Sequence, residues 1–264
     1  MPVGAEIVVT SAAALARPRL GLFDVSSLLL DFVTTTWAVS PERLREHLVA
    51  GIEPDVFTLA SGAPTAFVSA VSFLNTDFHV GFAPFVRLRA PQTNYRAYVR
   101  RGEERAAWFL GTQLDSFTVL VPRHVFRMPW SRSRVAHRAR WSGERLTELE
   151  WSGRGAAGQE RLRITGTGEP IGVPDGFRSE AEAREVLTHP LVGYFRRRGG
   201  RAVARYRVWH APLELERCRV DEARFELFER LGLVAPGQAP CSVLAQRATQ
   251  YTIDLPPRRI ELGG

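Results

Sequence analysis

The residues best suited to chemistry lie in one short segment, Gln92–Val99. Side chains alternate between the two faces of a β-strand, so Gln92, Asn94, Arg96 and Tyr98 share one face. An arginine among amides and a phenol presents a fork of charged donors to a carboxylate or phosphate, with neutral groups to orient it. The same pattern also fits a half-buried strand whose polar face meets water, because the opposite face is the more apolar one.

Whether Arg96 is buried decides between an anion-binding site and a solvent-facing strand. A guanidinium that leaves water without an anion carries a large free-energy penalty. If the polar face points inward, Arg96 therefore needs an internal carboxylate or an anionic ligand. Asp115 is the obvious internal carboxylate, and it competes with a ligand for this role.

Two of the six histidines are candidates for general acid–base chemistry, since an imidazole titrates near neutral pH. His210 ends a strand-like segment, and His124 stands beside Arg123. The alternative for each is a structural or surface histidine. No histidine pair has a metal-binding spacing and the two cysteines are far from forming a zinc motif, so we expect no metal site.

The chain contains no lysine, so all 35 of its basic side chains are arginine. A guanidinium stays protonated and cannot form a Schiff base with a carbonyl substrate. The motifs of serine hydrolases, dinucleotide-binding folds and P-loop proteins are also missing from the sequence. We therefore expect no cofactor, and any catalysis must be acid–base chemistry without lysine.

The net charge of +7 and the pI near 10.3 raise the possibility of a nucleic acid or another polyanion as partner. GC-rich coding bias gives a simpler explanation for the arginine content, and glutamates 144, 148 and 150 can neutralise the arginines at 123–140. A nucleic-acid partner is therefore the weaker hypothesis. Apolar runs are too short to span a membrane, so no membrane partner and a cytoplasmic location are expected.

The secondary-structure pattern predicts strands separated by turns, with only a few short helices. A Trp-Ser-Gly turn at 141–143 recurs at 151–153, which predicts a meander of three strands. Without βαβ alternation, we predict an α+β fold, mostly an antiparallel sheet that curls into a barrel. Residues 1–24 are predicted as a loosely attached leader and residues 25–264 as one domain. The expected strands are 28–39, 66–73, 93–100, 107–114, 134–141, 145–151, 160–166, 201–210 and 242–255, and the expected helices are 40–48, 179–188 and 221–231.

In order along the chain, several pieces resemble a bacterial domain-of-unknown-function family related to acetoacetate decarboxylase. The resemblance implies a single-domain barrel or cone of antiparallel strands with an internal ligand cavity. Two departures limit what it implies about activity: the decarboxylases use a lysine, and Gln92 stands where the family block has glutamate. The matching pieces are Trp37–Pro41, Gln92–Val99, Trp108–Leu110, Leu114–Ser116, Arg123-His124, Met128–Trp130, Trp209–Pro212 and 242–257.

If the chain forms the barrel that the resemblance implies, we expect the polar face of Gln92–Val99 to point inward and to bind an anionic or carbonyl-bearing organic acid. Arg96 would hold the anion. An enzyme would use His124 or His210, whereas a non-catalytic binding or sensor module needs only the arginine. A homo-oligomer is possible. The residues expected at the ligand are Gln92, Asn94, Arg96, Tyr98, Trp37, Trp108, Asp115 and Arg123.

Overall fold

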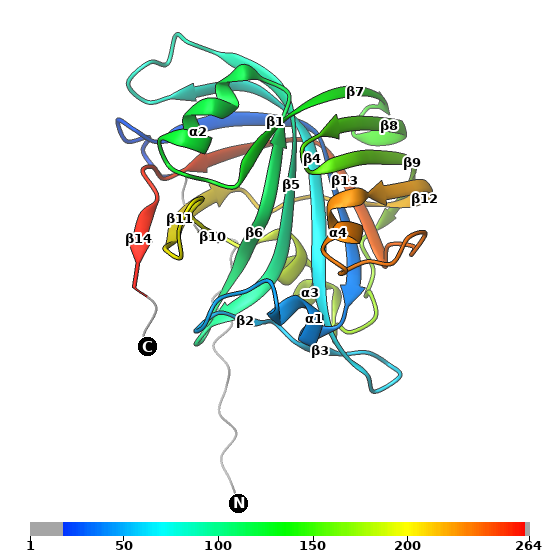
Figure 1. Ribbon diagram of the computed structural model, residues 1–264. Helices are drawn as coiled ribbons and strands as arrows, with labels where there is room; N and C mark the ends of the chain where they lie inside the picture. The colour runs from blue at the N-terminus through cyan, green and yellow to red at the C-terminus, as the bar shows by residue number, and fades with distance from the viewer. Residues whose placement is uncertain (1–17, 262–264) are drawn as a thin grey trace, which may run out of the picture.

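The computed structural model describes residues 18–261, and most of them belong to one large, strongly curled sheet (Figure 1). Neighbouring strands are antiparallel except for the β6–β7 and β6–β10 pairs. The strands are β1 (Val25–Val39), β2 (Glu53–Pro54), β3 (Phe57–Thr58), β4 (Pro64–Val80), β5 (Leu88–Arg101), β6 (Glu104–Leu114), β7 (Trp130–Ser142), β8 (Arg145–Gly155), β9 (Gly158–Pro170), β10 (Val192–Arg196), β11 (Val203–His210), β12 (Glu216–Phe225), β13 (Ser242–Ile253) and β14 (Arg258–Ile260). The helices are α1 (Pro41–Arg45), α2 (Leu120–His124), α3 (Glu180–Thr188) and α4 (Glu226–Arg230).

The sheet closes on itself twice. In order, β6 is followed by β7, β8, β9, β12, β13, β1, β4 and β5, and a β5–β6 pairing closes this first ring. A β11–β13 pairing closes a second ring through β10 and β6. The two rings share β13, β1, β4, β5 and β6, so both faces of this common wall are covered. The predicted α+β fold with a curled antiparallel sheet is confirmed.

The first ring is filled by a hydrophobic core. Trp37 of β1 packs edge-on against Phe225 and Phe228, and Tyr95 of β5 contacts the same two phenylalanines. Tyr95 belongs to the face of β5 opposite Arg96, and it is fully buried. The apolar face of the Gln92–Val99 strand therefore points into the first ring.

This core contains one buried carboxylate, Glu160 of β9, which is 0% exposed. Its oxygens accept hydrogen bonds of 2.7–2.9 Å from four neutral side chains: Thr93, Tyr95, Gln113 and Trp151. Burial raises the pKa of Glu160, while these four donors act in the opposite direction. The carboxylate thus ties β5, β6 and β8 to β9 in the middle of the ring.

Several sequence predictions need correction. The turn predicted at 151–153 is wrong, because Trp151–Gly153 lie within β8, and the chain turns only after Gly155. The helix predicted at 221–231 is wrong in its first half, because residues 216–225 form β12 and pair with β9 before the short α4 begins. Pairing with the long strand β9 overrides the local helical pattern in this segment. The helix predicted from Ser40 ends at Arg45, and the short strands β2, β3, β10 and β14 were not predicted.

The predicted leader lies mostly outside the described residues, which begin at residue 18. Its last residues are held against the β4–β5 hairpin by backbone hydrogen bonds from Phe82 to Leu22 and from Gly81 to Asp24. Among the described helices, none is long and apolar enough to cross a membrane.

Replacing Glu160 with leucine should destabilise the fold by about 3 kcal/mol or more, because four buried donors lose their acceptor and each orphaned group costs about 1–3 kcal/mol. Urea unfolding of the Glu160→Leu variant measures the loss. Glu150→Leu, at an exposed position on β8, is the control and should change stability by less than about 1 kcal/mol. Equal stability of the two variants would contradict a structural role for Glu160.

Candidate functional site

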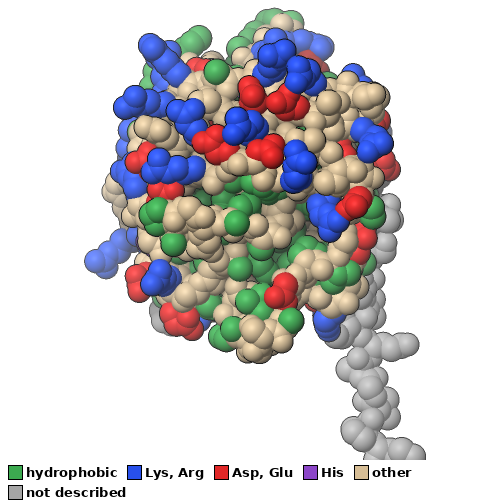
Figure 2. Space-filling view, turned by 90° about the vertical axis from the view of Figure 1, so that its right-hand side faces the viewer, with side chains coloured by type: hydrophobic (Ala, Val, Ile, Leu, Met, Phe, Trp, Pro, Cys, Tyr) green, Lys and Arg blue, Asp and Glu red, His purple; other side chains and the backbone are tan. Residues whose placement is uncertain are grey.

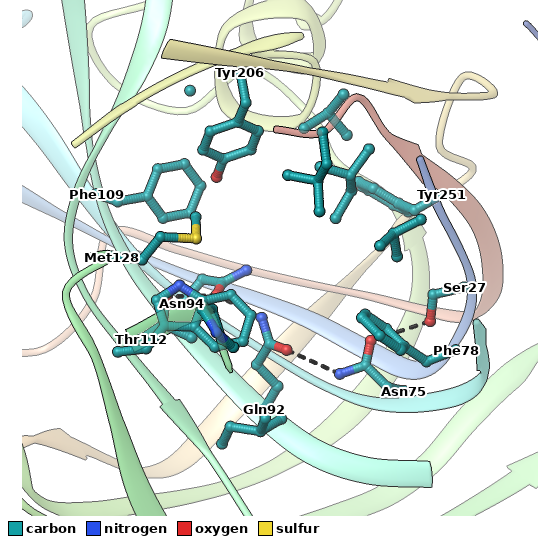
Figure 3. Close-up of a pocket in the computed structure, with 18 of the residues that line it drawn as sticks. Ser27, Asn75, Phe78, Gln92, Asn94, Phe109, Thr112, Met128, Tyr206 and Tyr251 are labelled. Atoms are coloured by element: carbon teal, nitrogen blue, oxygen red, sulfur yellow. Dashed lines mark hydrogen bonds between the residues drawn. The ribbon is translucent and has the colours of Figure 1, made fainter. Parts of the chain in front are cut away.

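The second ring encloses a cavity of about 630 Å³, which opens between the β4–β5 hairpin and α2. This volume is typical of pockets for drug-sized molecules. The wall is mainly apolar, with Phe73, Phe109, Met128, Val208 and Ile253 among its side chains. Figure 3 shows part of this wall. Polar side chains are few, and apart from Thr118 they lie on β1, β4, β5, β6, β11 and β13: Ser27, Asn75, Gln92, Asn94, Arg96, Thr112, Tyr206, His210 and Tyr251.

Arg96 lies at the inner end of the cavity and is 8% exposed. Its Nη2 donates to the carbonyl oxygen of Leu187 at 2.8 Å and to the Tyr98 hydroxyl at 3.3 Å. Its Nε is buried with no hydrogen-bond partner. Within residues 18–261, no carboxylate forms an ion pair with this guanidinium, so a buried positive charge faces the cavity without a counter-charge.

Asp115 does not neutralise Arg96. Its Oδ2 accepts a hydrogen bond of 2.9 Å from the backbone N–H of Val135, which joins the end of β6 to β7. Asp115 lines a separate, polar hollow on the outer surface with Arg134, Arg154 and Arg161. The internal competitor expected from the sequence is therefore absent from the inner end of the cavity.

A chain of hydrogen bonds links Ser27, Asn75, Gln92 and Asn94 along the polar wall (Figure 3). Ser27 donates to Asn75 Oδ1 at 3.1 Å, and Asn75 Nδ2 donates to Gln92 Oε1 at 3.0 Å. Gln92 Nε2 then donates to Asn94 Oδ1 at 2.8 Å, and Thr112 donates to the same oxygen at 3.0 Å. The Asn94 oxygen is thus occupied, while its Nδ2 has no hydrogen-bond partner in the described part of the chain.

His210 is the one histidine among the described lining residues of the cavity. Its Nδ1 lies 2.7 Å from the carbonyl oxygen of Ala211, so Nδ1 carries the proton and Nε2 keeps its lone pair. The ring stacks on Tyr251 and meets His189 edge-on, with centroids 4.6 Å apart in both contacts. Burial lowers the pKa of His210 to about 4, and the nearby Arg96 acts in the same direction.

Two tyrosines complete the inner end of the cavity. Burial raises the pKa of both Tyr206 and Tyr251 far above the usual range, and the charge of Arg96 partly offsets this shift in each. Both phenols therefore stay neutral at physiological pH. Among the described lining residues there is no aspartate, glutamate or cysteine, so the charge at the cavity wall is positive.

The structure brings together only some of the residues that the sequence analysis selected. The cavity is lined by four of them: Gln92, Asn94, Arg96 and His210. Tyr98 is not a lining residue, but its hydroxyl accepts a hydrogen bond from Arg96. Trp37 and Trp108 are buried in the core of the first ring, on the other side of the shared wall. His124 is exposed on α2, and Arg123 donates to the carbonyl oxygen of Trp130.

Several cavity residues were missed because they come from strands far apart in the sequence. Tyr206 shares a strand face with His210, so the alternation in 201–210 could have indicated it. Tyr251 lies directly opposite His210 in the β11–β13 pairing. No local signal predicts this pairing, nor the positions of Ser27 and Asn75.

The arginines of β7–β9 lie on the outer surface, interspersed with acidic side chains (Figure 2). Arg138 pairs across the strands with Glu150, and Arg140 forms an ion pair with Glu148. The expected neutralisation of this segment by glutamates is therefore present in part. Arg134 is an exception, since it faces Arg154 across the β7–β8 pair.

Comparison with solved structures shows the same fold. The chain is 11% identical to an acetoacetate decarboxylase-like enzyme from Sphingomonas wittichii RW1, with a TM-score of 0.59 over 92% of this chain and 94% of that one. Acetoacetate decarboxylase from Legionella pneumophila gives 11% identity and a TM-score of 0.59, over 99% of this chain and 98% of that one. The enduracididine biosynthesis enzyme MppR, in a structure described as a pyruvate complex, gives 13% identity and a TM-score of 0.54, covering 98% of each chain.

Sequence comparison is more limited. No curated protein sequence matches this chain significantly. The family model DUF2071, described as an uncharacterized conserved protein, matches residues 29–249. The match extends from the first third of β1 nearly to the end of β13, and therefore includes strands of both rings of the sheet. The resemblance to an uncharacterised family with an acetoacetate decarboxylase-like fold is confirmed: this chain belongs to the DUF2071 family.

Proposed function

We propose that this protein binds an organic acid in the cavity of the second ring, with the ligand's carboxylate on Arg96. The observation that carries this proposal is a buried guanidinium with no carboxylate partner among residues 18–261. Holding such a charge out of water is costly unless an anion accompanies it. A carboxylate in the cavity would supply the missing charge and accept hydrogen bonds from the guanidinium.

A second oxygen of the ligand would accept a hydrogen bond from Asn94. The hydrogen-bond chain from Ser27 occupies the Asn94 oxygen and leaves its amide N–H groups for the cavity. Asn94 and Arg96 are two residues apart on one strand face, which separates them by about 7 Å. This spacing suits a keto or hydroxy acid whose carboxylate and second oxygen are close together.

The rest of the ligand is apolar. Beyond the polar strip of β5, the described wall consists mainly of aromatic and aliphatic side chains, including Phe73, Phe109 and Met128. Leu88 at the mouth and Arg96 at the inner end are eight residues apart, roughly 26 Å along an extended strand. A small acid such as the pyruvate named for MppR would fill only the inner end of this space.

Proton transfer to or from such a ligand would use His210. The Nε2 of His210 has a lone pair that can accept a proton, because Nδ1 bonds to Ala211. His210 lies close enough to Arg96 for the charge of the guanidinium to lower its pKa. A pKa near 4 makes the imidazole a weak base, and this favours binding over catalysis as the primary role. Any reaction proceeds without a lysine imine, because the chain has no lysine.

Removing the guanidinium should weaken binding without harming the fold. A thermal-shift series of straight-chain and aromatic keto and hydroxy acids should stabilise the wild type, by about 2.7 kcal/mol at 100 times the dissociation constant. Arg96→Gln should weaken binding by about tenfold or more, since a charged hydrogen bond contributes about 1.5–3 kcal/mol. The control is Arg123→Gln. Like Arg96, Arg123 donates to a backbone carbonyl oxygen, but it lies outside the cavity. Equal affinity of the two variants would disprove the anion site.

Without ligand, the Arg96→Gln variant should be at least as stable as the wild type. The substitution removes a buried charge that has no counter-ion, whereas an arginine with a purely structural role would leave a less stable fold. Urea unfolding in a buffer free of carboxylates and phosphates measures the difference. A loss of stability comparable to that of a core truncation would indicate that Arg96 supports the fold and not a ligand.

His210 should make stability depend on pH. Its pKa is about 4 in the folded protein and 6.5 in the reference state, so the unfolded chain takes up more protons between these values. Stability should therefore fall as the pH drops from 6.5 to 4, by up to about 3 kcal/mol relative to a His210→Gln variant. Unfolding curves across this range test the prediction. His124→Gln, at an exposed site, should retain the wild-type pH profile.

A further inference from the structure

Large apolar side chains are exposed around the mouth of the cavity. Of the eleven such residues in the described part of the chain, nine lie on three short segments: 22–23, 82–86 and 117–125. Phe85 is 82% exposed and Phe117 is 71% exposed. We call these nine residues the rim: Leu22, Phe23, Phe82, Phe85, Val86, Phe117, Leu120, Val121 and Val125.

The three segments form one surface. Phe82 donates its backbone N–H to Leu22, and the rings of Phe23 and Phe82 are 6.2 Å apart. Phe23, Phe82 and Val121 also line the cavity, so α2 and the β4–β5 hairpin meet at its mouth. Figure 1 shows both at the same end of the molecule. An exposed apolar surface of this kind marks an interaction site.

The charges on and next to two of the rim segments are positive. Residues 82–89 and 117–127 contain Arg87, Arg89, Arg123 and Arg127 and no acidic residue, whereas Asp24 follows the segment 22–23. Arg87 pairs with Asp77, whereas Arg89 and Arg127 are exposed and have no side-chain partner within residues 18–261. The backbone N–H of Arg198 donates to Arg127, which brings another exposed arginine to this edge.

We propose that the rim docks on an anionic lipid bilayer, with its apolar side chains in the interfacial layer and its arginines on lipid phosphates. Surfaces that combine exposed aromatic and aliphatic groups with basic residues bind membranes in this way. A second copy of the chain fits less well, because a symmetric contact would bring the same arginines together. The docking is peripheral, and thus compatible with the lack of a spanning helix among the described residues.

Docking would place the cavity mouth against the lipid. An apolar organic acid that partitions into the bilayer could then enter the cavity without crossing water. This consequence rests on the proposed function, but the docking itself does not, since it is carried by the rim and its charges alone.

Co-sedimentation with lipid vesicles tests the docking. The full chain should bind vesicles of equal parts phosphatidylcholine and phosphatidylglycerol more tightly than vesicles of phosphatidylcholine alone, and binding should weaken as salt is raised. The triple variant Phe85→Ser, Phe117→Ser, Leu120→Ser should lose about tenfold or more in affinity. The pair Arg89→Gln, Arg127→Gln should lose affinity for the anionic vesicles only.

Matched controls exist on the rest of the surface. Val56 and Val173 are the exposed large apolar residues outside the rim, and Val56→Ser with Val173→Ser should leave vesicle binding unchanged. Arg96→Gln should also bind vesicles normally, which separates failure of the ligand proposal from failure of this one. Melting temperatures verify that each variant is folded.

Three results would overturn the proposal. The first is no binding of the wild type to anionic vesicles. The second is equal binding by the wild type and the triple variant. The third is a dimer, seen by light scattering, that the triple variant converts to monomer while vesicle binding is absent; the rim would then be an interface between copies of the chain.

Discussion

The shared wall of the sheet is the constraint on which the rest of the structure depends. Because β5 belongs to both rings, its middle part, residues 92–99, is largely buried on both faces, and the polar groups there depend on partners inside the protein or in the cavity. On one face, Thr93 and Tyr95 are satisfied by Glu160. On the other, the amides of Gln92 and Asn94 bond to one another and to their neighbours.

The two buried ionisable side chains on either side of this wall have different hydrogen-bond environments. Glu160 accepts hydrogen bonds from four donors, so both of its oxygens have partners inside the first ring. Arg96 has a carbonyl and a phenol for one nitrogen and no partner for Nε. A complete network is typical of a structural role, whereas an incomplete one at a cavity is typical of a ligand site.

The two ends of the cavity differ in polarity. Its polar groups follow the wall to Arg96, His210 and two neutral tyrosines at the inner end, while its mouth is apolar and continues into the exposed rim. The proposed acid would therefore have its carboxylate at the inner end and its apolar part toward the mouth. The relatives in the structure comparison share the fold at 11–13% identity, and the missing lysine separates the chemistry possible here from an imine mechanism.

The sequence by itself determined the curled antiparallel sheet and the shared face of Gln92, Asn94 and Arg96, because strand alternation is a local property of the backbone. It also excluded a lysine imine. Only the tertiary structure decided that this face lines a cavity, that Trp37 and Trp108 lie in the other ring, and that His210 joins Arg96 while His124 does not. These outcomes depend on which distant strands pair and where the sheet closes. Such pairings are set by long-range packing, which alternation within one strand does not encode.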